Sequence, residues 1–286
     1  MRILRLAEEA RAFSRSARAG GETVALVPTM GYLHEGHLSL VRLARQRASR
    51  VLATIFVNPL QFGPQEDLSR YPRDFERDRD LLEREGVDAL FAPEVAEMYP
   101  SGACTRVLVD GPLTEGLCGA RRPGHFAGVA TVVAKLFALS EPDVAVFGQK
   151  DAQQAAVIRR MTRDLNLPVE IVVAPIVREA DGLAMSSRNV YLSPDERSQA
   201  VVLRRALISA ETTVGAGERR TPVLLEIVRR EIASAPLARL DYAEIVDAET
   251  LVPAERVSSP SLLALAAYFG STRLIDNTLL QPDGEV

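Results

Sequence analysis

Short apolar runs alternate with longer amphipathic stretches between about residues 22 and 177 of this 286-residue chain. The apolar runs, each typical of a buried strand, are TVALVPT, RVLATIFV, VDALFAP, DVAVFG and EIVVAPIV. The stretches between them carry apolar residues at helical spacing and are HLSLVRLARQRAS, DFERDRDLLEREG, VATVVAKLFALS and DAQQAAVIRRMTRDLN. This alternation predicts an α/β fold with a parallel sheet covered by helices on both faces. Ligands of such sheets bind beyond the carboxyl ends of the strands, so function is expected in the residues after each run.

The alternation loosens after residue 178, which indicates a second domain. SPDERSQAVVLRRALISAETTV predicts a helix with Ser193 as N-cap and Pro194 at its first position, and TPVLLEIVRREIAS predicts another. LDYAEIVDAETL and SLLALAAYFGSTRLIDN predict strands of a small mixed sheet. We therefore expect two domains, residues 1–177 and a smaller α+β domain at 178–286.

Composition narrows the class of protein. The apolar fraction of 47% and charged fraction of 25% are those of an ordinary globular protein. The net charge of −4 comes without a basic stripe, so we expect no nucleic-acid partner. No apolar run approaches the roughly 20 residues of a membrane span, and the first residues lack an apolar signal core. Because two cysteines do not make a disulfide framework, we expect a protein of the reducing cytoplasm.

Two of the three histidines, His34 and His37, lie in TMGYLHEGH, between the first predicted strand and the helix after it. Three positions apart, they share one face of the helix start, whose exposed N–H groups favour phosphate. Gly31 and Gly36 allow a ligand to approach the backbone closely. These features predict a nucleotide site.

Plainer interpretations of the histidine pair remain open. Two histidines at a turn can simply be exposed or cap the helix. A metal site is a further alternative, although only His125 remains to join the pair. The chain has neither G-x-G-x-x-G after its first strand nor G-x-x-x-x-G-K-[ST], which disfavours a dinucleotide-binding fold and a P-loop.

Two further loops follow predicted strands. In FVNPLQFG, the neutral amides of Asn58 and Gln61 can hold hydroxyl groups and a carboxylate, although such a sequence is also an ordinary loop. In FGQKDAQQ, Lys150 is one of only two lysines in a chain that otherwise uses arginine. In such a chain, a lysine at a helix start is more typical of a phosphate contact than of an exposed residue without a function. Asp151 caps that helix or helps to position Mg²⁺ or ribose, and Gln154 can face the site.

Two loops rich in arginine complete the candidates. In VREADGLAMSSRN, the hydroxyls of Ser186 and Ser187 and the guanidinium of Arg188 can clamp a polyphosphate from a mobile loop. The alternative for this segment is a capped interdomain linker. RRPGHF, in which His125 lies among Arg121, Arg122 and Gly124, is a candidate substrate-facing loop and the weakest of the set.

Taken in order, PTMGYLHEGH, FVNPLQFG, RRPGHFAGV, FGQKDAQQ, DGLAMSSRN and TRLIDN resemble the motifs of the pantothenate synthetase (pantoate–β-alanine ligase) family over nearly the whole chain. HEGH alone is similar to the HxGH signature shared by nucleotidyltransferases and class I aminoacyl-tRNA synthetases. MSSRN is similar to the second, lysine- and serine-bearing loop of those synthetases, with arginine here. The resemblance implies ATP-dependent condensation of (R)-pantoate with β-alanine through a pantoyl adenylate, releasing pyrophosphate and then AMP.

The resemblance also implies an architecture and a set of site residues. It implies Mg²⁺, a Rossmann-like N-terminal domain that binds ATP and pantoate, a C-terminal lid domain, and a homodimer. Gln61 and Gln154 would hold pantoate, with Asn58 beside them and Gln61 also near β-alanine. The catalytic residues would be His37, His34, Lys150 and Arg188. The ATP-binding residues would be Met30, Gly31, Tyr32, Leu33, His34, Glu35, Gly36, His37, Gly148, Gln149, Lys150, Asp151, Val177, Met185, Ser186, Ser187 and Arg188.

The role of His37 and the identity of residue 149 differ from the usual description of the family. In the family, the residue at the position of His37 is usually assigned as a proton donor. We favour a hydrogen-bond donor to phosphate that keeps its proton, because pyrophosphate is already a good leaving group. The family commonly has glutamate where this chain has Gln149. The difference changes nothing if that side chain faces solvent, which we expect, and alters nucleotide affinity if it contacts ribose.

Two other functions remain as alternatives. The first is another enzyme of the superfamily that transfers a nucleotidyl group to a phosphorylated acceptor. Such an enzyme needs a cationic acceptor site, whereas Gln61 and Gln154 are neutral. The second is a nucleotide-binding protein without catalytic activity, which only turnover can exclude.

Overall fold

A computed structural model describes residues 1–64 and 66–282, and they divide into two compact units. The first unit comprises Met1–Val109 and Arg122–Pro175. The second comprises Asp110–Arg121 and the chain from Ile176 onward. The sequence predicts a single border after residue 177 and gives no sign that the segment 110–121 groups with the later part of the chain.

The first unit contains the predicted parallel sheet. Among the described residues its six strands lie in the order β1-β4-β3-β2-β5-β6, and every neighbouring pair is parallel. The strand β1 is absent from the sequence prediction because three residues are too few to show an alternating pattern. The strands are β1 (Arg2–Leu4), β2 (Val24–Thr29), β3 (Arg50–Ile55), β4 (Ala89–Phe91), β5 (Val144–Gly148) and β6 (Glu170–Ala174).

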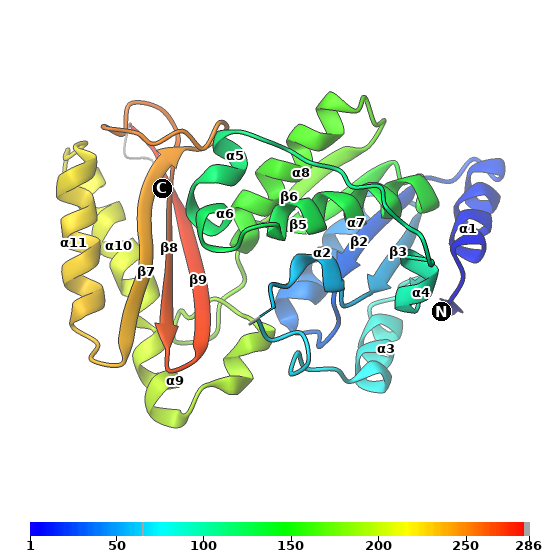
Figure 1. Cartoon of the computed structure of the whole chain (residues 1–286), viewed down its shortest axis with the longest axis horizontal. Helices are drawn as coiled ribbons and strands as arrows, with labels where there is room; N and C mark the ends of the chain where they lie inside the picture. The colour runs from blue at the N-terminus through cyan, green and yellow to red at the C-terminus, as the bar shows by residue number, and fades with distance from the viewer. Residues whose placement is uncertain (65, 283–286) are drawn as a thin grey trace. The chain divides into compact units, whose positions relative to one another are not determined.

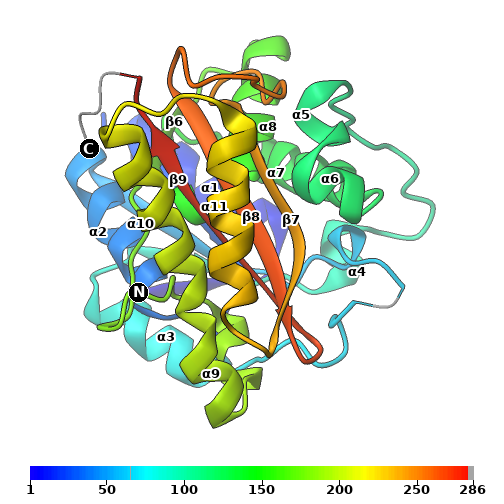
Figure 2. The ribbon, with the colours of Figure 1, turned by 90° about the vertical axis from the view of Figure 1, so that its left-hand side faces the viewer.

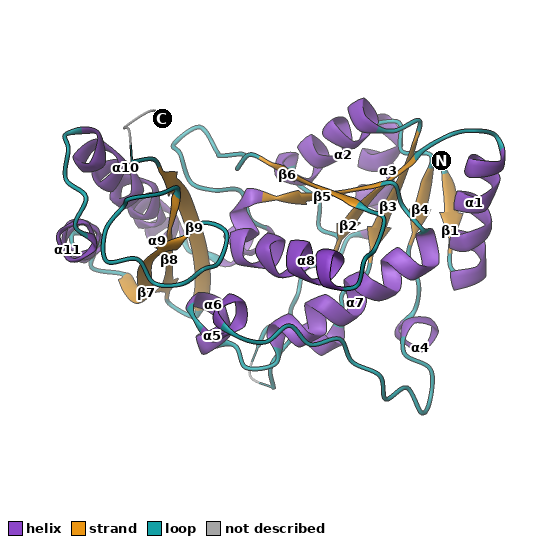
Figure 3. Cartoon of the chain, turned by 90° about the horizontal axis from the view of Figure 1, so that it is seen from above, coloured by secondary structure: helices purple, strands orange, loops and turns teal. Residues whose placement is uncertain are grey.

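Helices cover both faces of this sheet, as predicted and as Figure 3 shows. Along β2, Val24 and Leu26 pack under α1, α7 and α8, while Ala25 and Val27 face α2 and α3. Side chains of a strand point alternately to its two faces, so a strand apolar throughout becomes buried on both. The helices of this unit are α1 (Ala7–Ala19), α2 (Glu35–Arg47), η1 (Pro59–Gln61), α3 (Phe75–Arg84), α4 (Val95–Met98), α7 (His125–Ser140), η2 (Gln149–Asp151) and α8 (Ala152–Asp164).

The strand order places a switch point between β2 and β5. From β2 the chain proceeds to β3 and β4 on one side, and then crosses to β5 and β6 on the other, as Figure 1 and Figure 3 together show. Connections that leave in opposite directions open a crevice at the carboxyl ends of the two central strands. The segment after β2 and the segment after β5 are therefore brought together by the topology.

The second unit is an α+β structure. Its sheet, β7-β8-β9, is covered on one face by α10 and α11, as Figure 2 shows. The sheet is antiparallel, so the predicted mixed sheet is wrong: only Gly270 and Ser271 separate β8 from β9, and so short a connection cannot join parallel strands. The single helix predicted from residue 194 is divided at Val201 into α9 and α10. The elements are α5 (Pro112–Glu115), α6 (Leu117–Arg121), η3 (Ser187–Tyr191), α9 (Pro194–Ala200), α10 (Val202–Gly215), α11 (Thr221–Ala233), β7 (Ala238–Asp247), β8 (Ser261–Phe269) and β9 (Thr272–Leu280).

Candidate functional site

The segment after β2 leaves the strand through a turn with two consecutive left-handed residues. Gly31 has φ of +85° and Tyr32 has φ of +49°. A side chain at position 31 would place its Cβ 3.0 Å from Ile55 Cγ2 and 3.1 Å from a carboxylate oxygen of Asp78. Gly31 is therefore required both for the backbone conformation and for the space it leaves.

The buried carboxylate of Asp78, on α3, holds this turn in place. Its Oδ2 accepts a hydrogen bond from the backbone N–H of Tyr32 at 2.5 Å, and its Oδ1 accepts one from Leu33 at 2.7 Å. Charge-assisted bonds of this kind are stronger than bonds between neutral groups. On the same helix, the guanidinium of Arg77 lies over the Tyr32 ring, 5.4 Å from its centroid. The entry to α2 is thus fixed from a neighbouring helix.

Sequence reasoning missed Asp78, although the sequence contains a signal. The segment DFERDRDLLEREG reads as an amphipathic surface helix with many charges. At helical spacing, however, Phe75, Asp78 and Leu82 fall on the face that packs inward. Asp78 and Leu82 are the two buried residues of α3. A carboxylate on the apolar stripe of a helix indicates buried donors that it must satisfy.

The two histidines occupy the first turn of α2. His34 is the N-cap residue and His37 is the third helical residue. The backbone N–H of His34 donates to Nδ1 of His37 at 3.3 Å, and the two ring centroids lie 4.1 Å apart. Because Nδ1 of His37 accepts a hydrogen bond, a neutral ring carries its proton on Nε2. His37 therefore presents an N–H donor from its far side.

Burial keeps His37 uncharged near neutral pH. Desolvation, together with the positive charges of His34 and Lys150, lowers the pKa of His37 well below its usual range. Lys150 lies on η2 directly after β5, and its charge is among those that act on His37, on the helix after β2. Lys150 Nζ also lies 4.0 Å from a carboxylate oxygen of Asp151. The topology has thus brought two histidines and a lysine to one edge of the sheet, as the sequence predicts.

The amide of Asn58, at the end of β3, is fully engaged within the protein. Its Nδ2 donates to Gln61 Oε1 and to the carbonyl of Gly128, both at 3.1 Å. Its Oδ1 accepts from the Tyr99 hydroxyl at 2.8 Å and from the N–H of Leu60 at 3.3 Å. These bonds use two donors and two acceptor positions, which is the capacity of an amide side chain.

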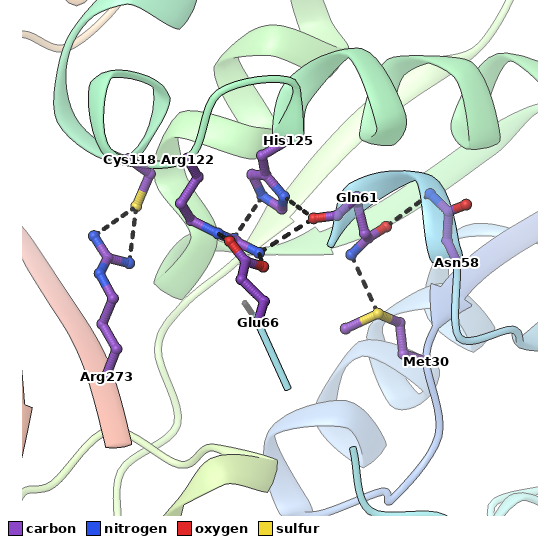
Figure 4. A network of polar contacts seen from close by, with 8 residues as sticks. All are labelled: Met30, Asn58, Gln61, Glu66, Cys118, Arg122, His125 and Arg273. Carbon is purple, nitrogen blue, oxygen red and sulfur yellow. Dashed lines mark hydrogen bonds and ion pairs between the residues drawn. The ribbon is translucent and has the colours of Figure 1, made fainter. Parts of the chain in front are cut away.

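Gln61 lies between Asn58 and the segment after β2, as Figure 4 shows. Since Oε1 accepts from Asn58, the orientation of the amide is set, and its Nε2 donor end lies 3.2 Å from Met30 Sδ. Gln154 is the third residue of α8 and is half-buried. Three groups therefore lie at the same edge of the sheet: the thioether of Met30 after β2, the neutral amide of Gln61 after β3 and the cation of Lys150 after β5.

The candidates from Val177 to Arg188 belong to the second unit. Val177 and Met185 are joined by a backbone hydrogen bond of 3.0 Å across a short hairpin that turns at Gly182, where φ is +93°. Arg178 anchors this hairpin to β9 through a two-pronged ion pair with buried Asp276, with N–O distances of 2.7 and 2.9 Å. Ser186 caps η3 by accepting from the N–H of Arg188. This segment is therefore tied to its own unit by specific contacts.

Two kinds of feature are absent from the part of the chain that the structure describes. No three His, Cys, Asp or Glu side chains within residues 1–64 and 66–282 form a group suited to a metal ion. No described helix is both long and apolar enough to cross a membrane.

Comparison with known proteins gives a consistent result over the whole chain. A family model described as pantoate-β-alanine ligase matches residues 2–279. Pantothenate synthetase of Moorella thermoacetica is 57% identical over 281 residues, which cover 98% of this chain and 99% of that protein. The enzyme of that name from Roseiflexus sp. (strain RS-1) is 59% identical over 281 residues, with 98% and 100% covered.

Solved structures agree with this result. The crystal structure of pantothenate synthetase from Thermus thermophilus matches with a TM-score of 0.94 and 52% identity, covering 99% of this chain and 100% of that one. Pantoate-β-alanine ligase from Francisella tularensis, complexed with "Beta-gamma ATP" and β-alanine, matches with a TM-score of 0.82 and 30% identity, covering 98% and 97%. The Rossmann-like class of the first unit is thereby confirmed.

The geometry of the turn after β2 makes a testable prediction about Asp78. Replacing it by asparagine leaves one acceptor oxygen and sets an NH₂ group against a backbone N–H. We expect D78N to lower the free energy of unfolding by about 1–3 kcal/mol, the cost of a buried unsatisfied donor. Urea denaturation measures this change.

The matched control is D80N, two residues along the same helix. Asp80 is half-exposed and pairs with Arg79 at the surface, so its loss should cost less than about 1 kcal/mol. Equal destabilisation by the two substitutions would contradict a special role for Asp78.

Proposed function

Because this chain belongs to the pantoate–β-alanine ligase family, we propose that its first unit binds ATP at the carboxyl ends of β2 and β5 and pantoate beside η1. The chain is an enzyme that condenses pantoate with β-alanine at the expense of ATP. The observation that carries the placement is that the segment after β2, with His34 and His37, and the segment after β5, with Lys150, both lie at the switch point of the sheet.

In the proposed first half-reaction, the carboxylate of pantoate attacks the α-phosphorus of ATP. A bond forms between a carboxylate oxygen and phosphorus, the bond to the bridging oxygen of pyrophosphate breaks, and pyrophosphate leaves with that electron pair. The enzyme supplies alignment and neutralises charge on the phosphates. Lys150 contributes a compact positive charge, and neutral His37 donates through Nε2–H without transferring its proton.

We assign the pantoate site to Gln61 and Gln154. Asn58 fixes the amide of Gln61 with its Nε2 donor end toward Met30, and a donor suits the carboxylate and hydroxyl oxygens of pantoate. Neutral amides hold a carboxylate without neutralising it, so it keeps its nucleophilicity. Asn58 has its own hydrogen bonds within the protein, so we propose that it acts through Gln61 rather than by touching the substrate.

In the proposed second half-reaction, the amine of β-alanine attacks the acyl carbon of the adenylate as its free base. A C–N bond forms, the bond from the acyl carbon to the AMP oxygen breaks, and AMP leaves while the amine loses a proton. The adenylate must be shielded from water until then. We assign shielding and nucleotide contacts to the second unit, on the family resemblance at Val177 and at Met185, Ser186, Ser187 and Arg188.

Mg²⁺ fits this proposal as part of the ATP substrate. Protein sites commonly bind Mg²⁺ through one or two carboxylates together with substrate phosphates. The described residues offer no larger acidic group, and Asp151, beside Lys150, is the carboxylate we expect next to the ion. Its contribution is to neutralise charge on the phosphates.

Assembly and location follow from the family resemblance and the composition. We propose a homodimer, which light scattering tests against the 31.2 kDa mass of one chain. We also propose a cytoplasmic protein, which the low cysteine content supports. Localisation of a tagged chain tests this second proposal.

Removing either phosphate-binding side chain should strongly slow adenylate formation. We expect H37A and K150A to slow pyrophosphate release in a single turnover by at least about a hundredfold, the usual effect of losing one preorganised donor. Circular dichroism checks that both variants stay folded. R160A, which removes a cation from the exposed surface of α8, is the control. Near-wild-type rates in H37A or K150A would exclude that residue from the assigned role.

The pantoate site makes a separate prediction. Q61A should raise the KM for pantoate about tenfold and leave the KM for ATP within about twofold, because a hydrogen bond to a charged group contributes about 1.5–3 kcal/mol. Q61E, of the same shape but negatively charged, should raise the KM for pantoate further. Steady-state kinetics with each substrate varied in turn measures the effect. Equal changes for pantoate and ATP would contradict the assignment.

A further inference from the structure

A cluster of polar side chains around the start of α7 holds the main chain of Gln61. It consists of Arg122, His125 and Glu66, shown with Gln61 in Figure 4. Of these, the mechanism above uses none. We infer that Arg122 and His125 are positioning residues, which orient Gln61 for pantoate by holding its backbone carbonyl. This inference rests on the proposed role of the Gln61 side chain.

The hydrogen-bond pattern fixes the state of His125. Arg122 Nη1 lies 2.9 Å from His125 Nε2, and because guanidinium can only donate, Nε2 must accept. The proton of the neutral ring is then on Nδ1, which donates to the carbonyl of Gln61 at 2.8 Å. Burial and the charge of Arg122 lower the pKa of His125 to about 4, in agreement with a neutral ring.

Arg122 holds the same carbonyl directly as well as through His125. Its Nη2 donates to Gln61 O at 3.3 Å, so this oxygen receives two donors, which matches its two lone pairs. Its Nε and Nη2 also donate to the two carboxylate oxygens of Glu66, at 2.8 and 2.6 Å. Burial, the largest single effect, raises the pKa of Glu66, but the hydrogen bond and charge of Arg122, with smaller contributions from His125 and Gly63, together leave the pKa below its usual value.

These contacts define Arg122 as an anchor rather than a ligand of a substrate carboxylate. Three of its nitrogens, Nε, Nη1 and Nη2, are engaged by Glu66, His125 and Gln61. A planar fork with five N–H groups suits such a fixed arrangement, and lysine cannot reproduce it. Binding of an incoming carboxylate by Arg122 would require some of these bonds to break.

Close packing of α7 on η1 further restricts the position of the Gln61 main chain. A Cβ at Gly128 would lie 2.3 Å from the carbonyl oxygen of Leu60 and 2.6 Å from the nitrogen of Gln61. His125 and Gly128 are three residues apart and therefore share one face of the helix. At Gly128, α7 lies in close contact with η1. His125, on the same helix, bonds the carbonyl of Gln61, which is the last residue of η1. Gln61 is thus held by α7 at its main chain and by Asn58 at its side chain.

Kinetics of His125 variants tests the inference. H125L removes the donor to Gln61 O, whereas H125N keeps an N–H donor at the position of Nδ1. We expect H125L to raise the KM for pantoate about tenfold, corresponding to about 1.4 kcal/mol, with the KM for ATP and for β-alanine changed by less than about twofold. H125N should restore most of the affinity for pantoate, which a loss of general stability would not allow.

Arg122 and Glu66 provide variants that do not depend on the folding of H125L. R122K and E66Q should each raise the KM for pantoate, R122K more, because lysine cannot bond His125, Gln61 and Glu66 together. R121Q is the control, since Arg121 contacts Asp241 of the second unit instead. A rise confined to the KM for β-alanine in R122K would overturn the inference and make Arg122 a substrate ligand.

A double-mutant cycle separates this inference from the proposed function. In a Q61A background, H125L should raise the KM for pantoate no further, because the side chain that it orients is absent. If Q61A raises that KM and H125L does not, the positioning role is overturned while the assignment of Gln61 stands. If Q61A itself has no effect, the assignment fails and the positioning role fails with it.

Discussion

The hydrogen bonds from Tyr32 and Leu33 to the carboxylate of Asp78 are the constraint on which the candidate site depends. A left-handed turn after β2 leaves these two backbone N–H groups outside both strand and helix, and buried donors need a partner. Asp78 supplies both acceptors from a separate helix, α3, that follows the next strand in the sequence. The turn so fixed delivers His34 to the N-cap and His37 to the first turn of α2.

Hydrogen bonds within the protein also hold Gln61, the neutral amide of the site, before any substrate binds. Its amide is oriented by Asn58, which is itself held by the hydroxyl of Tyr99, and its carbonyl is held by His125. Burial raises the pKa of Tyr99 to about 12, so the hydroxyl stays protonated and donates. An enzyme that relies on alignment rather than on a nucleophilic side chain needs such preorganisation, because misplacement of the reacting groups directly lowers the rate.

The sequence predicted what depends on local pattern. Apolar runs and helical spacing located the parallel sheet, and the rule for strand ends then singled out His37, Lys150 and Gln61, which the structure places at one edge. It did not reveal Asp78 or the pairing of Arg122 with Glu66, because these contacts join segments far apart in the chain. Asp78 looks exposed in so polar a stretch unless its helical spacing with Phe75 and Leu82 is considered, and the partner of Arg122 is known only from the fold. The sheet of the second unit was mispredicted as mixed because apolar runs carry no information on strand direction.

In the proposed reaction, the first unit activates pantoate before β-alanine takes part. The most direct test is release of pyrophosphate from ATP and Mg²⁺ with pantoate, in the absence of β-alanine and with enzyme at substrate-like concentration. We expect release of one pyrophosphate per enzyme molecule, with sustained AMP release only after β-alanine is added. Pyrophosphate release that requires β-alanine from the start would contradict an adenylate intermediate formed at this site.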